Sequence, residues 1–265
     1  MTNFYKRDGF QFFRKTSNVS DILEDRLVIE NSKLSNTIDY INQNGIKVIS
    51  INPYISTVES LSFLKHIPFI EGLYLLQDDI DIFPINHLKN LRVLHLNKLD
   101  STIDFTNLKN IEVLGCTSKT ELKNVGCCSK LFWLWLDNFK VDDLTSLSGL
   151  TNLKHLNLHK TSIVNLVGIA SLENLNNITI DSASKLVSLQ GLESSNYNLS
   201  SINILNAKHL ISYQQIGMLK HIKKVRFLKT GVCENFDFLN NLDTLTEFIH
   251  DGKYIKKVDS GKYTK

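Results

Sequence analysis

One pattern constrains this chain more than any other feature of its sequence. An apolar residue, two variable residues, an apolar residue, one variable residue and a last apolar residue recur along most of its length. The copies are IKVISI (46–51), IEGLYL (70–75), LRVLHL (91–96), IEVLGC (111–116), LFWLWL (131–136), LKHLNL (153–158), LNNITI (175–180), LSSINI (199–204), IKKVRF (222–227) and LTEFIH (245–250). These ten copies begin 20 to 24 residues apart, which is the period of proteins built from stacked structural repeats.

The alternation within each copy predicts a short strand. Side chains at the fourth and sixth positions should point into the protein, while those at the third, fifth and seventh positions should point to the opposite face. A single repeat cannot bury its leucines alone, so the strands should stack in parallel, about 4.8 Å apart, as a solenoid. A further apolar residue stands three positions before nearly every copy after the first, and Asn196 is the exception there.

These spacings resemble the leucine-rich repeat family, and within it the bacterial 22-residue class of the internalins. The resemblance covers about residues 46–250. It implies an α/β fold with a curved parallel sheet on a concave face and short helices, 3-10 turns or irregular segments on a convex face. The chain departs from the family at the ninth position, where asparagine is usual. Leu99, Lys119, Phe139 and Thr161 stand there instead, so the family pattern does not predict the conformation of the turn after each strand.

The sequence outside the repeats predicts protective ends for the solenoid. FYKRDGFQFF alternates aromatic and polar residues around Asp-Gly, which predicts a hairpin. SNTIDYINQNG (35–45) predicts a short helix capped by Ser35 or Asn36 and ended by Gly45. The expected organisation is an amino-terminal cap (1–45), a solenoid of about ten repeats (46–250) and a basic carboxy-terminal tail or cap (251–265).

Composition narrows the class of protein. A net charge of +3 on 265 residues does not call for a polyanionic partner, and the tail, with five lysines against two aspartates, is expected to be solvated. We find no apolar run long enough for a signal peptide or a membrane span, and none of the wall-sorting features of the internalins, so we expect a cytoplasmic protein. Four cysteines without paired spacing predict reduced thiols, no metal and no cofactor. Cys116 and Cys128 should be buried, and no role is assigned to Cys233.

The third, fifth and seventh positions of successive repeats should form three columns on the outward face of the predicted sheet. These outward columns contain the candidate binding residues. Trp133 and Trp135 are the only two tryptophans, and they take the third and fifth positions of one strand. Exposed indoles provide a large rigid contact area and are enriched among binding hot spots. The alternative is that they only pack on outward neighbours such as Val113 and His155. The partner-binding candidates are Tyr74, His95, Trp133, Trp135, Asp137, His155, Asn157, His159 and Asp181.

The same columns give little support for catalysis. The histidines of HLNLH (155–159) would lie about 13 Å apart on a strand, too far to share a metal ion. Asp137, His159 and Asp181 occupy the seventh position of three successive repeats and could form an acid–base cluster. A charged patch for a partner is favoured, because no nucleophile accompanies the histidine and no glycine-rich phosphate loop occurs.

We therefore expect a non-catalytic module, monomeric when unbound, that holds a partner protein on its concave face. SFLKHIPFIEGLYLL (62–76) and LVSLQGLE (186–193) look like segments of bacterial proteins suspected of serving as immunity factors, which implies a toxin domain as partner. One alternative is a regulatory or scaffolding subunit of a cellular enzyme. A nucleic-acid binder using the tail with Lys224 and Arg226 is disfavoured by the aromatic and acidic central columns, and a hydrolase built on His159 ranks last.

Overall fold

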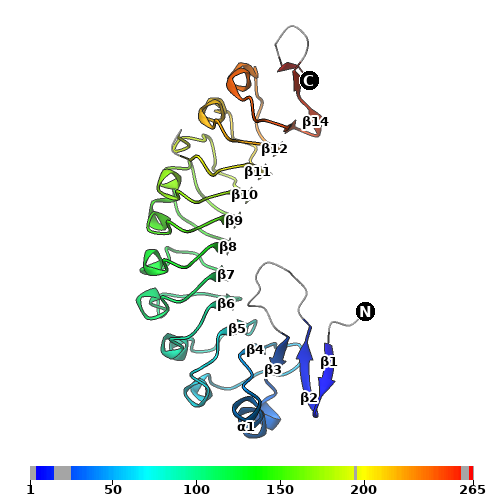
Figure 1. Cartoon of the computed structure of the whole chain (residues 1–265), viewed down its shortest axis with the longest axis vertical. Coiled ribbons are helices and arrows are strands. Elements are labelled where there is room, and N and C mark those ends of the chain that lie inside the picture. Colours follow the sequence, from blue (N-terminus) through cyan, green and yellow to red (C-terminus); the bar gives the residue numbers. More distant parts are fainter. Residues whose placement is uncertain (1–3, 15–24, 194–195, 258–262, 265) are drawn as a thin grey trace. The chain divides into compact units, whose positions relative to one another are not determined.

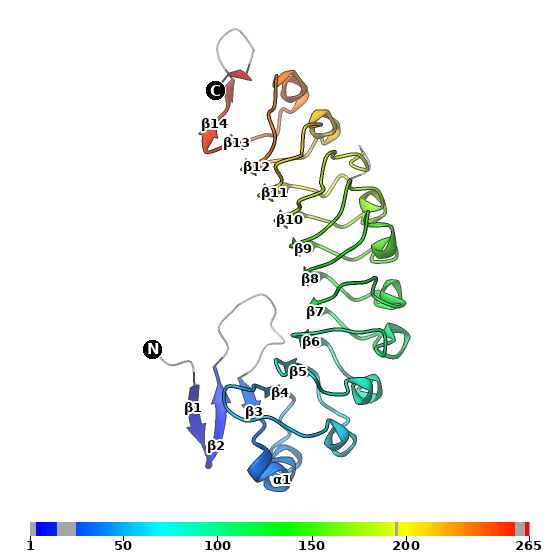
Figure 2. The same cartoon turned by 180° about the vertical axis from the view of Figure 1, so that it is seen from behind.

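The computed structural model describes residues 4–14, 25–193, 196–257 and 263–264. The chain forms two compact units, residues 1–117 (unit 1) and 118–265 (unit 2). Each unit is built from the predicted repeat, a short strand followed by a turn that in most repeats ends in a 3-10 helix. In unit 2 the strands lie side by side along one side and the 3-10 helices along the other (Figures 1 and 2). The solenoid expected from the sequence is confirmed.

Unit 1 contains seven strands within its described residues, and they neighbour one another in chain order. They are β1 (Phe4–Arg7), β2 (Phe10–Phe13), β3 (Arg26–Val28), β4 (Val48–Ile51), β5 (Gly72–Leu75), β6 (Val93–Leu96) and β7 (Val113–Thr117). The helical segments are η1 (Asn31–Lys33), α1 (Leu34–Asn44), η2 (Ser62–His66), η3 (Phe83–His87) and η4 (Phe105–Asn107).

The strands of unit 2 also neighbour one another in chain order. Its strands are β8 (Trp133–Asp137), β9 (His155–His159), β10 (Asn177–Asp181), β11 (Ser201–Leu205), β12 (Lys224–Leu228), β13 (Glu247–His250) and β14 (Lys253–Tyr254). Its 3-10 helices are η5 (Val125–Cys127), η6 (Thr145–Leu147), η7 (Ile169–Ser171), η8 (Gln214–Met218) and η9 (Asp237–Asn241). A separate antiparallel pair, β15 (Lys256–Lys257) and β16 (Tyr263–Thr264), lies in the predicted tail.

The amino-terminal end of unit 1 differs from the expected cap in two details. β1 and β2 pair as a hairpin around Asp8 and Gly9, but β3 adds a third strand that is antiparallel to β2 and parallel to β4. The helix N-cap predicted at Ser35 or Asn36 is wrong, because α1 begins at Leu34. The chain leaves its extended conformation at Glu30, turns as η1 and runs directly into α1. Gly45 ends the helix in the left-handed conformation, with φ +61°, as predicted.

The repeat residues form the core by keeping one register. Leu156 lies opposite Leu134 on one side and Ile178 on the other, and the exposed fraction of these three side chains is 1% or less. The break in the pattern at Asn196 is compensated by hydrogen bonds. Its side-chain nitrogen donates to the carbonyl of Ile169 over 3.2 Å, so a polar residue replaces leucine without leaving a buried group unpaired.

The turns of unit 2 explain how the repeat works without asparagine at the ninth position. The residue that follows each strand from β8 to β12 has positive φ. After β8, β9, β10 and β11 its N–H donates to the carbonyl of the last residue of the next strand over 2.8 to 3.0 Å. The ninth position is filled by buried Phe139, Thr161 and Ala183. Backbone hydrogen bonds therefore link the turns. Buried apolar side chains and the Thr161 hydroxyl, which donates to the carbonyl of Phe139 over 2.9 Å, replace the amide ladder.

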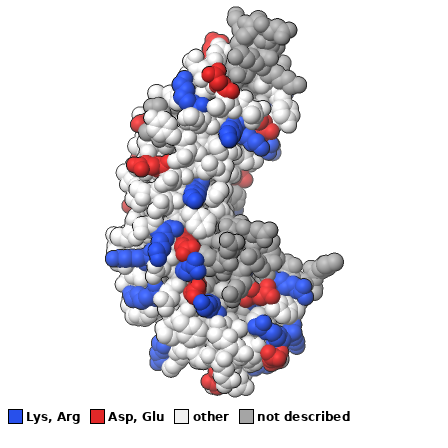
Figure 3. Space-filling view, in the orientation of Figure 1, with Lys and Arg blue, Asp and Glu red and all other residues white. Residues whose placement is uncertain are grey.

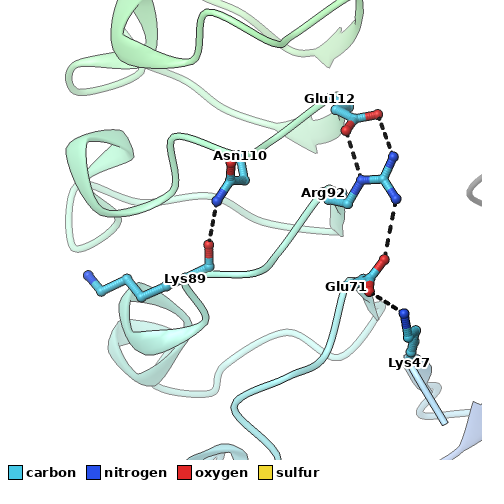
Figure 4. Close-up of polar contacts among 6 residues, drawn as sticks. All are labelled: Lys47, Glu71, Lys89, Arg92, Asn110 and Glu112. Carbon is cyan, nitrogen blue, oxygen red and sulfur yellow. Dashed lines mark hydrogen bonds and ion pairs between the residues drawn. The ribbon is translucent and has the colours of Figure 1, made fainter. Parts of the chain in front are cut away.

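A charged ladder crosses unit 1 at the second repeat position (Figure 4). Lys47 Nζ lies 2.6 Å from Glu71 Oε1, and Arg92 bridges Glu71 at 3.3 Å and Glu112 at 2.8 Å. Blue and red atoms alternate along this line on the face shown in Figure 3. The hydrogen bond from Lys47 is the main cause that lowers the pKa of Glu71, and the bonds to Glu112 raise the pKa of Arg92. The ladder favours one register of the strands, because a shift of one residue would separate the opposite charges and place them opposite apolar residues or glycine.

Asparagine side chains link neighbouring repeats at a position that the sequence pattern did not indicate. Asn110 donates from its side chain to the carbonyl of Lys89 over 2.9 Å (Figure 4). Asn152 and Asn174 donate in the same way to the preceding repeat, over 2.7 and 2.9 Å. In these repeats asparagine thus links neighbouring repeats from the position three residues before the strand begins. No helix in the described part of the chain is both long and apolar enough to cross a bilayer.

Candidate functional site

The third, fifth and seventh positions of β8, β9 and β10 form the surface that we call the sheet face of unit 2. On β8, the side chains of Leu134 and Leu136 are fully buried, while Trp133, Trp135 and Asp137 between them are half-buried. β9 and β10 show the same alternation. The division of this strand into core leucines and outward tryptophans is therefore as the sequence predicted, although neither indole is fully exposed.

The parallel register brings the predicted residues of unit 2 into rows. Trp133 lies opposite His155, and Trp135 lies opposite Asn157. His159 lies between the other two members of its row, Asp137 on β8 and Asp181 on β10. All seven candidates in unit 2 thus belong to three adjacent strands, as expected from the repeat.

The seventh-position row is a connected polar chain. His159 Nδ1 lies 2.5 Å from Asp137 Oδ1, and His159 Nε2 lies 4.0 Å from Asp181 Oδ2. Asp181 Oδ1 in turn accepts a hydrogen bond from Asn206 over 2.7 Å. The row can offer carboxylate oxygens to a cationic group at the surface. Asn206 is an addition that the sequence reading missed, because it stands one residue beyond the seventh position.

His155 occupies a different environment at the other end of the same strand. Asn177 Nδ2 lies 3.1 Å from His155 Nδ1, which fits an amide donating to an unprotonated ring nitrogen. Burial lowers the pKa of His155, and the charge of Lys154 lowers it further. Near neutral pH this side chain is therefore suited to polar contacts rather than to presenting a positive charge.

Tyr74 and His95 belong to unit 1, where they form a stack with a residue that the sequence did not indicate. The Arg26 guanidinium lies 3.4 Å from the centroid of the Tyr74 ring, and the Tyr74 and His95 rings are 5.9 Å apart at 24°. Tyr74 is only 8% exposed. Burial lowers the pKa of Arg26 and raises that of Tyr74. Arg26 lies in β3, outside the repeats, so no spacing in the sequence pointed to it.

A glycine makes room for the last member of this stack. A Cβ on Gly115 would lie 2.6 Å from His95 Nδ1, so the imidazole occupies the space that a side chain at residue 115 would need. Burial is the main cause that lowers the pKa of His95, followed by the charge of Arg26. Tyr74 and His95 are thus held rigidly, with His95 the more accessible of the two.

The remaining chemistry of the described residues is sparse. They contain no group of three or more histidine, cysteine, aspartate or glutamate side chains arranged to hold a metal ion. Burial raises the pKa of Cys116 and of Cys128 to about 12, as expected for cysteines inside the core. An open depression in unit 1 is lined by Pro53, Tyr54, Thr57, Leu76, Gln77, Asp78 and Asn97, none of which is a predicted site residue.

Comparison with known proteins identifies the fold. An internalin, inlF of Listeria monocytogenes, has a TM-score of 0.65 and 20% identity over 83% of this chain, which spans 64% of the internalin chain. A chain of the Toll–Spatzle complex of Drosophila gives 0.62 and 16% over 80% of this chain and 30% of its own length. A chain of the TLR13–ssRNA13 complex gives 0.57 and 18% over 80% and 34%. No family model and no curated protein matches. The fold is a leucine-rich repeat solenoid.

Proposed function

We propose that this chain is a non-catalytic module that holds a partner protein against the sheet face of unit 2. The observation that carries the proposal is the composition of three adjacent strands. β8, β9 and β10 present two indoles, two imidazoles and two carboxylates, and the strands beneath them are anchored by fully buried leucines and isoleucines. Such a face is rigid, so a partner can bind it with little loss of side-chain entropy.

The half-buried state of the tryptophans agrees with this role. The residues opposite Trp133 and Trp135 are His155 and Asn157, which are smaller than indole. Part of each ring can therefore pack on its own sheet while the rest contacts a partner. Hot-spot tryptophans act in this way, through area that is removed from water only in the complex.

Catalysis has less support from the same residues. The His159 row ends at Leu205 on β11, and its polar neighbours are Asn206 and Ser182, of which the serine donates 3.0 Å to Asp181 rather than to the histidine. A hydroxyl aligned with the imidazole would be needed for acyl transfer. We propose that the carboxylates of this row instead pair with a cationic group of the partner.

The partner that we propose is a toxin domain, which the chain would neutralise in the cytoplasm by covering it. This rests on the resemblance of residues 62–76 and 186–193 to bacterial immunity factors. The TLR13 complex contains single-stranded RNA, which makes nucleic acid the competing ligand. Asp137 and Asp181 disfavour it, because carboxylates at the centre of the face would repel phosphate. We retain 1–45 as cap, 46–250 as solenoid and 251–265 as tail.

A pull-down with purified variants tests the sheet face. The Trp133→Ala/Trp135→Ala double variant should lose a stoichiometric protein partner, with affinity falling at least about thirtyfold, because a hot-spot side chain contributes about 2 kcal/mol or more. Ser201→Ala/Asn203→Ala changes the same two positions of β11 and is the matched control. Nuclease treatment excludes bridging nucleic acid, and circular dichroism confirms folding. A double variant that keeps every partner contradicts the proposal.

Co-expression tests the immunity role separately. The protein encoded by the adjacent gene should stop growth when expressed alone, and wild-type chain should restore growth. The tryptophan double variant should not. An adjacent gene product that is harmless with or without this chain removes the immunity role but leaves the sheet face as a site for another protein.

A further inference from the structure

The turns that follow β9, β10, β11 and β12 carry a second regular surface of unit 2, which we call the turn face. Each turn contains one exposed lysine and, two to four residues later, an aliphatic residue that is not part of the core. The pairs are Lys160 with Val164, Lys185 with Val187, Lys208 with Ile211 and Lys229 with Val232. None of these residues belongs to the sheet face, and the leucine pattern does not require any of them.

Hydrogen bonds between turns hold the aliphatic residues in line. The N–H of Val187 donates to the carbonyl of Val164 over 3.0 Å, and the N–H of Ile211 donates to the carbonyl of Val187 over 3.2 Å. Ser188 and Ser212 form a parallel bridge at the next position. These contacts set the spacing of successive turns to that of neighbouring strands, about 4.8 Å.

The row of aliphatic side chains becomes more exposed along the unit. Val164 is half-buried, and the exposed fractions of Val187, Ile211 and Val232 are 39%, 68% and 73%. Gly231 precedes Val232, the last member of the row, and packs closely on the preceding turn. A Cβ at residue 231 would lie 2.2 Å from the carbonyl oxygen of Leu210, so this approach requires glycine. Side chains of this type gain about 25 cal/mol for each Å² that a partner removes from water.

The lysines give the turn face a net positive charge, although the Asp251 carboxylate accepts a hydrogen bond from the backbone N–H of Lys229 over 2.9 Å. All four are exposed, and none forms an ion pair with a carboxylate among the described residues. Residues 160–167, 182–190, 206–214 and 229–236 contain a single acidic residue, Glu234. A partner that matches this surface must therefore combine negative charge with apolar side chains.

The spacing of the turns indicates the shape of that partner. In an α-helix, side chains on one face recur every three to four residues, which is about 5.3 Å along the axis. In an extended strand they recur every second residue, about 6.6 Å. Four turns are separated by three intervals of about 4.8 Å. Over that length the side chains of a helix would be displaced from the turns by only about 1.5 Å, whereas those of a strand would be displaced by about 5 Å.

We propose that the turn face binds an acidic amphipathic α-helix of a partner protein. Its carboxylates would pair with Lys160, Lys185, Lys208 and Lys229, and its apolar side chains would cover the aliphatic row beside them. A single-stranded nucleic acid fits less well, because such ligands stack on aromatic side chains and the exposed apolar residues of this row are aliphatic. The proposal is independent of the sheet face, since the two surfaces share no residue.

Fluorescence anisotropy with designed peptides tests this proposal. The probe is a labelled peptide of about 15 residues whose glutamates and leucines recur on adjoining faces of a helix. A second peptide of the same composition distributes them around the helix. The full chain should bind the first peptide at least about tenfold more tightly in low salt, because only that peptide can pair with the lysines and cover the aliphatic row together.

Variants locate the binding. Lys185→Glu/Lys208→Glu should weaken the amphipathic peptide at least about tenfold, and Ile211→Ser should weaken it several-fold. Lys154→Glu/Lys223→Glu makes the same charge change at exposed second positions of the repeat and should have little effect. The tryptophan double variant should bind the peptide normally, so failure here is distinguishable from failure at the sheet face.

Four outcomes would overturn the proposal. They are no binding, equal binding of both peptides, an equal loss in the control variant, or preferential binding of a labelled oligothymidylate that is abolished by Lys185→Glu/Lys208→Glu. The last outcome would assign the turn face to nucleic acid.

Discussion

Replacing Gly191 by alanine tests how closely successive repeats of unit 2 pack. Gly191 has φ +107°, and a Cβ built there would lie 2.2 Å from the carbonyl oxygen of Leu166, 2.3 Å from its carbonyl carbon and 2.5 Å from the nitrogen of Val167. All three atoms belong to the backbone of the preceding repeat. Because non-bonded carbon contacts are about 3.5 Å, the backbone would have to move by about 1 Å.

The expected loss is large because several costs act together. Alanine at this φ costs about 1–2 kcal/mol, and overpacking against backbone typically costs about 1–3 kcal/mol. The shift would also weaken the 2.8 Å hydrogen bond from the N–H of Leu166 to the carbonyl of Gln190, which contributes about 1 kcal/mol. We therefore expect the free energy of unfolding to fall by at least about 3 kcal/mol.

Urea unfolding followed by circular dichroism measures this loss, with Gly45→Ala as the matched control. Gly45 also has positive φ, +61°, but a Cβ there would meet no atom within 4 Å. That variant should lose only about 1–2 kcal/mol, the cost of the left-handed conformation alone. If the two variants lose the same amount, close backbone packing between repeats does not contribute as we reason.

The remaining predictions concern unit 1. Arg92→Met removes the centre of the charged ladder and should lower the free energy of unfolding by about 1 kcal/mol in low salt and less in high salt, because its ion pairs are only partly buried. Lys98→Met, at an exposed pair with Asp79, is the control and should be nearly neutral; a salt-independent Arg92→Met effect would contradict an electrostatic ladder. The pKa of His95 is lower in the folded chain than in the unfolded chain, so the unfolded chain takes up the proton at a higher pH. The free energy of unfolding should therefore fall as the pH drops from about 7.5 to about 5.5. Urea unfolding at several pH values should show a shallower decline in His95→Gln, and an unchanged slope would show that this histidine does not contribute.

Much of the sheet face of unit 2 could be predicted because it depends on local period alone. The rule that alternate residues of a strand face opposite sides places Trp133 outward once Leu134 is inward. Parallel stacking in a constant register then places His159 between Asp137 and Asp181, as observed. None of these steps requires knowledge of side-chain packing, so the spacing of the leucines alone predicts the row of Asp137, His159 and Asp181.

The features that were missed depend on packing between residues distant in the chain. Arg26 lies outside the repeats, yet its guanidinium covers Tyr74, so a residue predicted to be outward and accessible is almost completely buried. The ninth position could not be interpreted from the family pattern. Whether a buried hydroxyl such as that of Thr161 finds the carbonyl of Phe139 depends on the neighbouring repeat.

By itself, the sequence determined that this chain stacks short parallel strands in one register and which side chains face away from the core, because both follow from a period of hydrophobic residues. Only the tertiary structure decided which outward residues remain accessible, how the turns are linked without their usual asparagines, and that aliphatic residues of successive turns after β9 lie in a row. Accessibility and alignment arise between repeats, where hydrogen bonds and packing join residues more than 20 positions apart, and no local pattern records them.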